Sequence, residues 1–477
     1  MLPNRGKLIR MWQHLHSDTK RALILIGVCI VLYSIIFSVF FSIGSAKSAT
    51  PERMIGIGLD DVNDYVGLAH VMLETGRFAL TPDSPPEFFR TPGYPAFLAL
   101  VLVIFGTVLA SPFFQVLFTA LAVALVYLIG VRYFSRTVAL VAAIVYMFDP
   151  LVMYPAWALI SESLFMVLLL ASVYTIGIET RRQWLPFVVA GILIGLAALV
   201  RPVAFYLIPL IACMALAHSV SWRTTLRGAG IFLAMAGLVM SPWMLRNYAL
   251  TGHFEVSTTG IFNLFYYDIP LFEQTRTGTE YREIQKALGL RAGTTSERAL
   301  QSFAYSDRET EVVLEELRKH PIQYVLFHLV RSEMLFIGSS INSVSYHLYQ
   351  HGIMGQNPAP IGAWGMILEG RWNDALIQTF SSTPKLLERL FWVFAYFGVF
   401  YTVITSILRR SSNMWWIIAA FLLIHAIAVL AGPLSDDTRY RIPAEPFILL
   451  LAINALFDLV GRIRSWRRPQ TPGIVLP

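Results

Sequence analysis

The chain alternates long apolar runs with short polar segments along nearly its whole length. Ten apolar runs are long enough, or nearly long enough, to cross a bilayer as helices. They comprise residues 22–43, 113–131, 137–148, 163–178, 185–200, 203–217, 228–239, 390–408, 414–430 and 442–456. We therefore predict an all-α polytopic membrane protein with about ten transmembrane helices. The first run exceeds the apolar core of a signal peptide, so we expect an uncleaved anchor.

The composition is also that of a membrane protein. Charged residues make up 14% of the 477 residues and hydrophobic residues 56%, with a mean hydropathy of +0.59. Water-soluble domains carry about 25% charged residues, so that class is excluded. Cys29 and Cys213 both lie within apolar runs, where a thiol behaves as a small hydrophobe. From them we predict neither a disulfide nor a metal site.

Basic residues are concentrated in segments that flank the apolar runs. Residues 1–21, 132–136, 179–183, 219–228, 409–412 and 461–477 together hold 17 Lys and Arg against 2 Asp and Glu, and the rest of the chain holds 20 against 28. Because basic loops stay in the cytoplasm, we expect these segments and both termini there. The net charge of +7 therefore reflects membrane topology, and no basic domain suggests a nucleic-acid partner.

Two further apolar segments do not fit this topology as spans. If residues 91–110 crossed the membrane, three basic segments would move to the outer side, so we predict an interfacial or re-entrant helix on the outer face. Residues 320–340 are interrupted by Arg331 and Glu333 and are expected to lie on the outer surface. The charge-dense residues 281–319 are expected to form amphipathic helices on the same side.

This pattern divides the chain into three parts without an internal repeat. Residues 1–243 form an N-terminal transmembrane module whose first outer loop, 44–112, carries a cluster of carboxylates. Residues 244–386 form an outer segment with amphipathic helices. Residues 387–477 add the last transmembrane helices and a basic cytoplasmic tail.

The first outer loop gathers three aspartates in the stretch GLDDVNDYVGLAHVML. In a helix, Asp61 and Tyr65 share one face, and Asp60 and Asp64 share an adjacent one. Taken alone, Asp60 or Asp61 would be explained as a helix cap, because backbone N–H groups and the helix dipole favour a carboxylate there. A second carboxylate, Glu162, begins a span on the same side.

Arginines occupy the outer ends of four other segments. They are Arg90, Arg201, Arg246, Arg439 and Arg441. Each alone is explained by snorkelling or by binding of terminal carbonyls. Together they suit a ligand with a phosphate at the headgroup level, because guanidinium groups bind phosphate in a bidentate manner. A nearby carboxylate can accept the proton of an attacking hydroxyl, which favours direct, inverting sugar transfer from a polyprenyl-phosphate donor.

The motifs that carry these residues resemble those of a known family. They are DDVNDYVGLAHVMLETGRF, RTPGYPAFLAL, ISESLF, LVRP, SPWMLRNYALTGHF and DTRYRIPAEPFILLLA, in this order. The sequence resembles bacterial GT-C class integral-membrane glycosyltransferases, relatives of the protein O-mannosyltransferases and of the lipid A aminoarabinose transferase. The resemblance runs from the first span to the last and implies a GT-C type helical bundle with outer-face interfacial helices.

The resemblance also implies roles for individual residues. The catalytic base would be Asp61, and Arg90 would contact the donor phosphate, with the other four arginines as further donor-binding residues. Fallback catalytic or substrate-binding residues are Asp60, Asp64, Tyr65 and Glu162. Some distant relatives bind a divalent metal between such acids. Because no histidine cluster or tight acidic ligand set demands a metal here, we predict that no cofactor is required, with a divalent metal as the open alternative.

The expected partners are a polyprenyl-phosphate sugar donor such as an undecaprenyl-phosphate sugar, membrane lipids, and a glycan, lipid or protein acceptor of the cell envelope, including lipopolysaccharide. The resemblance implies a bacterial inner membrane with the active site on the periplasmic side. Alternatives are a secondary transporter, a lipid-linked polysaccharide ligase or polymerase, and a non-catalytic assembly factor. A transporter would favour ionisable residues near the bilayer midplane, whereas the charges here collect at one face.

Overall fold

The computed structural model describes residues 16–46, 50–57, 60–214, 222–350, 370–373, 383–431 and 438–466. Nearly all regular structure within these ranges is helical, and the β-bridge between Ala79 and Pro86 is isolated. The predicted all-α class is therefore confirmed.

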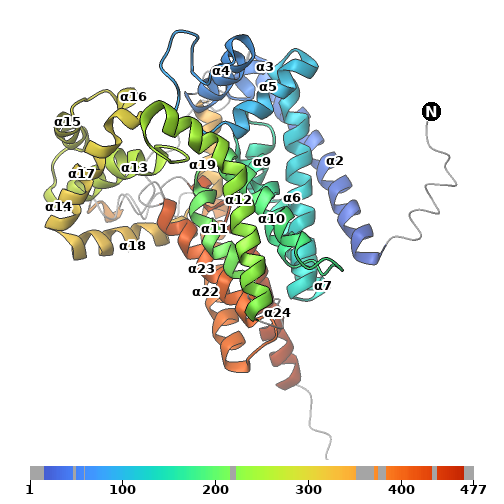
Figure 1. The fold of residues 1–477 in the computed structure, drawn as a ribbon. Helices are drawn as coiled ribbons and strands as arrows, with labels where there is room; N and C mark the ends of the chain where they lie inside the picture. Colours follow the sequence, from blue (N-terminus) through green and yellow to red (C-terminus); the bar gives the residue numbers. More distant parts are fainter. Residues whose placement is uncertain are drawn as a thin grey trace, which may run out of the picture.

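Each of the ten predicted apolar runs contains a helix (Figure 1). These are α2 (Ser17–Ala46), α6 (Ser111–Tyr133), α7 (Arg136–Met147), α9 (Glu162–Ile176), α10 (Leu185–Val200), α11 (Val203–Met214), α12 (Trp222–Thr251), α22 (Thr383–Arg409), α23 (Met414–Ala431) and α24 (Glu445–Trp466). Six of the described helices, α2, α6, α12, α22, α23 and α24, are long and apolar enough to span a membrane.

The remaining four of these helices are shorter. Helix α7 and the following α8 (Pro150–Met153) form part of a further candidate span that is bent by 66°. Helices α9, α10 and α11 contain 15, 16 and 12 residues. The total of about ten spans therefore stays a prediction, because a straight span needs about 20 residues.

The basic segments meet at one end of the bundle. Asp18 at the start of α2 accepts a hydrogen bond from Arg136 at the start of α7, at 2.9 Å. Asn413, just before α23, donates to the carbonyl of Tyr133 at the end of α6. The aspartate-bearing helix α4 (Asp60–Thr75) and α5 (Gly93–Phe105) lie toward the opposite end (Figure 1). The fold thus separates the two groups of charges that the sequence distinguishes.

Helix α5 begins and ends at the same end of the bundle. Arg90 before it contacts Asp61, and Gln115 after it donates to the carbonyl of Ile160, which lines the same cavity as Asp61. Its 13 residues reach about 20 Å, less than the ~30 Å of a bilayer core. The segment 91–110 therefore does not cross the bundle, as predicted. Apolar side chains such as Val103 are exposed on it, which suits a helix at the membrane surface.

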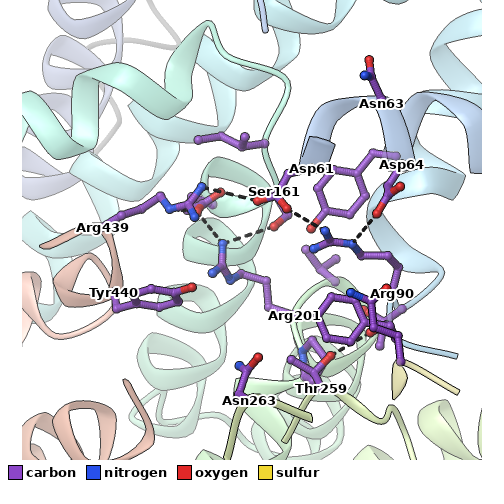
Figure 2. Close-up of a pocket in the computed structure, with 18 of the residues that line it drawn as sticks. Asp61, Asn63, Asp64, Arg90, Ser161, Arg201, Thr259, Asn263, Arg439 and Tyr440 are labelled. Atoms are coloured by element: carbon purple, nitrogen blue, oxygen red, sulfur yellow. Dashed lines mark hydrogen bonds and ion pairs between the residues drawn. The ribbon is translucent and has the colours of Figure 1, made fainter. Parts of the chain in front are cut away.

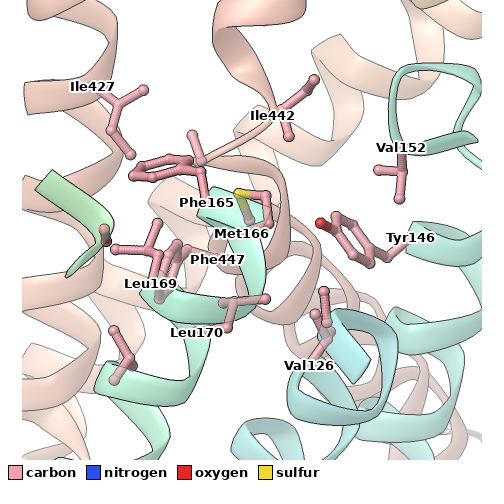
Figure 3. Packing of buried hydrophobic residues seen from close by; sticks show 14 of the residues in the cluster. Val126, Tyr146, Val152, Phe165, Met166, Leu169, Leu170, Ile427, Ile442 and Phe447 are labelled. Carbon is pink, nitrogen blue, oxygen red and sulfur yellow. The ribbon is translucent and has the colours of Figure 1, made fainter. Parts of the chain in front are cut away.

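The centre of the bundle is packed around α9. Figure 3 shows Phe165 and Leu169 of this helix beside Phe447 of α24 and Ile427 of α23, and all four are buried. Their side chains fill the space between helices from the N-terminal and C-terminal halves of the chain. This packing joins the two halves and holds Glu162, at the first position of α9, in a fixed place.

Close helix contact elsewhere depends on glycine. Gly191 and Gly195 of α10 are four residues apart and face α12. A Cβ atom on Gly191 would lie 2.5 Å from the carbonyl oxygen of Phe232, and one on Gly195 would lie 2.8 Å from the Cβ of Val239. Small residues at this spacing let two membrane helices approach closely, where van der Waals packing and not the hydrophobic effect drives association.

The segment predicted to lie outside the membrane contains short helices that cover one side of the α4 end. They are α13 (Thr259–Asn263), the π-helical turn η4 (Leu264–Asp268), α14 (Ile269–Thr277), α15 (Tyr281–Ala292), α16 (Glu297–Leu300) and α17 (Phe303–Lys319). The predicted helices in 281–319 are thus present. Phe262, Phe265 and Val312 pack there against Phe89 of the first outer loop. We call residues 259–319 the outer unit.

Two more helices connect the outer unit to the last spans. Helix α18 (Pro321–Ile337) lies crosswise to the long helices (Figure 1) and contacts α22 and α23. It is absent from the candidate spans among the described helices, which agrees with the prediction for 320–340. Helix α19 (Ser340–Gln350) follows it and contacts α8 and the 3-10 helix η6 (Thr438–Arg441).

Candidate active site

A cavity of about 1000 Å³ opens at the end of the bundle where α4 lies. Its walls come from the first turns of α4, the loop before α5, the start of α9, the corner between α10 and α11, α19, η6 and the outer unit. Figure 2 shows five charged side chains of its lining, Asp61, Asp64, Arg90, Arg201 and Arg439. Glu162, Glu297 and Arg298 line it as well.

Asp61 lies in the first turn of α4 and faces the cavity. Its Oδ1 accepts a hydrogen bond from Nη2 of Arg90 at 2.6 Å, and its Oδ2 lies 3.7 Å from Nη1 of Arg439. The Asp61 side chain is 43% exposed. Burial raises its pKa, but attraction by Arg90 and then Arg439 outweighs burial and lowers the pKa to about 2. Asp61 is therefore ionised at neutral pH.

The other members of the aspartate cluster differ in their placement. Asp64, one helical turn on, accepts a hydrogen bond from Nε of Arg90 at 3.3 Å. Tyr65 lines the cavity, where its ring packs edge-on against Tyr94 and lies 5.2 Å from the guanidinium carbon of Arg90. The side chain of Asp60 lies outside the described part of the structure, so its fallback role stays a prediction.

The position of Arg90 is fixed by its own loop. Oε1 of Glu87 accepts hydrogen bonds from the backbone N–H groups of Phe88, Phe89 and Arg90, at 3.1, 2.7 and 3.2 Å. The carbonyl of Phe89 in turn accepts hydrogen bonds from Ser257 and Thr259 at the edge of the outer unit. This loop therefore presents the guanidinium between Asp61 and Asp64 with little backbone freedom.

Glu162 and Arg201 form a second charged pair in the cavity. Oε1 of Glu162 lies 2.5 Å from Nη1 of Arg201 and 3.6 Å from Nε of Arg439. Arg201 ends α10 in an extended conformation because Pro202 disfavours a helical residue before it. The break turns the arginine into the cavity, where it also donates to Ser161. Arg439 thus lies between the Asp61 and Glu162 carboxylates and links the two pairs (Figure 2).

Two predicted donor-binding arginines lie outside the cavity lining. Arg246 donates to the carbonyls of Glu87 and Phe78 and packs 4.6 Å from the centre of the Trp243 ring. Its guanidinium thereby supports the loop that carries Arg90. Direct binding of the donor phosphate by Arg246 stays a prediction.

Arg441 is fully buried. It forms an ion pair with Glu445 at 3.0 Å, donates to the carbonyls of Leu335 and Gly338, and stacks over Trp392. Through these contacts Arg441 anchors η6 to α18 and α24, and it lies outside the cavity lining. Its expected phosphate contact likewise stays a prediction. Of the neighbouring pair in DTRYR, only Arg439 faces the cavity.

Sequence reasoning missed the contribution of the outer unit. Arg298 on α16 lies 3.4 Å from Asp64 and 3.3 Å from Glu87, so a fourth arginine joins the cluster. Asn263 and Tyr267 also line the cavity. No motif marks these residues, because the chain folds back over more than 150 positions to bring them to the first loop.

A metal-binding cluster is not part of this arrangement in the described ranges. They hold no group of three or more His, Cys, Asp or Glu side chains suited to a metal ion. The carboxylates of Asp61, Asp64 and Glu162 are each paired with arginine instead. The prediction that no cofactor is required remains a prediction.

The fold and the cavity define a helical membrane protein with an arginine–carboxylate site at one end of its bundle. Residues 86–245, about a third of the chain, match the family model described as dolichyl-phosphate-mannose-protein mannosyltransferase. The match includes Arg90, Glu162 and Arg201 and ends just before Arg246. It confirms the predicted resemblance to GT-C class membrane glycosyltransferases over this segment and supports that class for the chain.

Solved structures and curated proteins were also compared. The chain is similar to the Archaeoglobus fulgidus oligosaccharyltransferase in complex with Zn and sulfate, with 15% identity, a TM-score of 0.43, and coverage of 85% of this chain and 46% of that chain. It is also similar to that organism's oligosaccharyltransferase in complex with an inhibitory peptide and a dolichol-phosphate, at 15% identity and a TM-score of 0.41, covering 85% and 47%. The chain spans about half the length of these proteins. No curated protein matches the chain.

Proposed function

We propose that the protein transfers a sugar from a polyprenyl-phosphate donor to an acceptor hydroxyl at the outer face of a bacterial cytoplasmic membrane. The acceptor oxygen attacks the anomeric carbon, the bond from that carbon to the phosphate oxygen breaks, and the phosphate leaves on the lipid. The acceptor proton passes to Asp61. A single displacement of this kind inverts the anomeric centre. Asp61 held between two arginines in a cavity at the bundle end is the observation that carries the proposal.

Asp61 can act as an effective base only if a bound phosphate also interacts with its two arginine partners. A carboxylate with a pKa of about 2 is a weak base. When a donor phosphate enters, Arg90 and Arg439 face a second anion, so their attraction for Asp61 is weakened and its pKa rises. Donor binding would thereby make Asp61 a stronger base, and without a donor Asp61 would remain a weak base.

The arginines supply the charge that the leaving group needs. The phosphate of the donor carries its negative charge in the bound state and gains more as the bond to the sugar breaks. Arg90, Arg201 and Arg439 approach the same region from the first loop, the α10–α11 corner and η6. Permanently charged, preorganised donors of this kind stabilise developing charge most when water is excluded.

The proposed orientation has independent support from charge. Basic segments collect at the end of the bundle opposite the cavity, and such segments remain cytoplasmic. The cavity would then face the periplasm. An acceptor hydroxyl would arrive from the aqueous side and the lipid tail from the bilayer.

The direct test is transfer in a reconstituted membrane. Purified protein in nanodiscs would receive undecaprenyl-phosphate-linked sugars, and mass spectrometry of envelope glycans with and without the gene would identify the product. Asp61→Asn should reduce turnover about 10²- to 10⁴-fold, the usual contribution of a general base, while leaving undecaprenyl phosphate binding intact. If this variant turned over at the wild-type rate, Asp61 would not be the catalytic base.

A matched variant tests the phosphate contact. Arg90→Ala should weaken binding of undecaprenyl phosphate about 10- to 100-fold, because a charge-assisted hydrogen bond to phosphate is lost. Arg308→Ala serves as the control, since this arginine is exposed and outside the cavity lining. Uptake of a solute into proteoliposomes without any glycan product would instead favour a transporter.

A further inference from the structure

One wall of the cavity carries uncharged hydrogen-bonding groups that the protein does not use. Asn263 and Tyr267 of the outer unit both line the cavity. Within the described residues, neither the Asn263 amide nor the Tyr267 hydroxyl forms a hydrogen bond to the protein. The charged groups nearby, such as Asp61 and Arg90, are paired with each other. Unused donors and acceptors on a cavity wall are suited to a ligand that supplies the missing partners.

The backbone that carries the two side chains is held in place at several points, and the Tyr267 ring packs edge-on against Phe262. Thr259, one turn before Asn263, donates to the carbonyl of Phe89 at 2.7 Å, which joins this wall to the Arg90 loop. Tyr267 lies in the π-helical turn η4, a conformation that is rare and often found at functional sites. Phe265 in the same turn is buried in the outer unit. The wall is therefore preorganised.

The wall is also close to the proposed base. Burial, then the carboxylate of Glu297 and, among weaker causes, that of Asp61 raise the pKa of the Tyr267 hydroxyl. Tyr267 is therefore a neutral donor at physiological pH. A group bound to Asn263 and Tyr267 would lie within the same cavity as the Asp61 carboxylate, where an acceptor hydroxyl is required.

We propose that Asn263 and Tyr267 form the acceptor subsite and that the acceptor is a saccharide. This inference rests on the proposed function. A planar amide presents a donor and an acceptor side by side, which matches adjacent hydroxyl groups on a sugar ring. The tyrosine ring supplies a flat apolar face for the C–H side of the ring, and its hydroxyl supplies another hydrogen bond. Gln301 and Arg298 extend this polar wall toward Asp64.

One observation favours a saccharide over a peptide, and a second shows that there is room for it. Extended peptides commonly bind by adding a strand to an exposed sheet edge, and the described residues form no sheet at this cavity. The volume of about 1000 Å³ lies at the upper end for a single small-ligand pocket, so a second sugar fits beside the donor headgroup.

The test uses purified full-length protein in nanodiscs loaded with undecaprenyl phosphate. Binding is measured to a panel of biotinylated hexose, hexosamine and uronic-acid oligosaccharides and to a pool of Ser/Thr-rich peptides. Asn263→Ala and Tyr267→Phe should each weaken saccharide binding about tenfold, the loss expected for one or two hydrogen bonds, with no change in undecaprenyl phosphate affinity. Tyr248→Phe is the control, because Tyr248 is exposed on α12 and outside the cavity lining.

Three results would overturn the inference. They are binding of peptides and not saccharides by the wild type, binding of neither class, and saccharide binding that both variants leave unchanged. The proposed function fails separately, if undecaprenyl phosphate does not bind or if the Arg90→Ala variant binds it with unchanged affinity. The two failures are distinguishable because one concerns saccharide binding and the other concerns undecaprenyl phosphate binding.

Discussion

At the scale of single residues, the cavity is built from opposite charges that restrain each other. Arg90 contacts both Asp61 and Asp64, and Arg439 lies between Asp61 and Glu162. Each arginine therefore has two carboxylate partners, and a phosphate can compete for it without leaving a buried charge unpaired. Such pairing neutralises the charges in the cavity and makes the protonation of Asp61 depend on what the arginines bind.

A first prediction concerns the pH dependence of Arg90→Met. Removing the guanidinium removes the largest attraction that lowers the pKa of Asp61, while the opposing effect of burial remains. The pKa of Asp61 in the variant should therefore rise above about 2. Since the base must be deprotonated, the acid limb of the kcat/KM profile should move to higher pH than in the wild type. An acid limb at unchanged pH would contradict this coupling.

At the scale of elements, the site depends on breaks between helices. Helix α10 ends before Arg201 and Pro202, the 3-10 helix η6 carries Arg439, and the loop before α5 carries Arg90. The helices behind these breaks are held by close packing, so small shifts between helices would displace the arginines. The contact of α10 with α12 is especially close, because Gly191 of α10 lies directly against the backbone of α12.

Gly191→Ala tests this contact. The new Cβ would meet the carbonyl oxygen of Phe232 at 2.5 Å, which forces the two helices apart. We expect a loss of about 1–3 kcal/mol in stability, the usual cost of overpacking, measured as a lower thermal unfolding temperature in detergent. The matched control is Gly237→Ala on α12, where a Cβ meets nothing within 4 Å. Equal behaviour of the two variants would show that α10 and α12 do not need this close approach.

At the scale of the whole molecule, charge distribution and site position agree. The basic ends of the helices lie at the end of the bundle opposite α4 (Figure 1). The cavity is lined by the first turn of α4 and, on one side, by the outer unit. If the basic end is cytoplasmic, every proposed catalytic group faces the periplasm.

Cysteine labelling tests the orientation. In a background without Cys29 and Cys213, Arg308→Cys in the outer unit should react with a membrane-impermeant maleimide in intact spheroplasts. Arg181→Cys, between α9 and α10, should react only after the membrane is permeabilised. Both positions are exposed, so accessibility depends on the side of the membrane. The reverse pattern would place the cavity in the cytoplasm.

The sequence alone determined the helical membrane class, the ten apolar runs and the separation of basic from acidic segments. These features depend on local hydropathy and charge, because the bilayer favours apolar helices in its core and basic segments on the cytoplasmic side. It also identified Asp61, Arg90, Glu162, Arg201 and Arg439 as candidates, because charges are rare enough in such a chain to stand out.

Tertiary structure decided which candidates meet. Arg439 and Arg441 are two residues apart, yet one faces the cavity and the other pairs with Glu445 in the protein interior. Their separation depends on the turn of η6 and on partners from distant helices, which hydropathy does not encode. Tertiary packing also places three residues of the outer unit in the site, Arg298, Asn263 and Tyr267. The outer unit packs onto the loop of Phe89 through contacts between residues far apart in the chain.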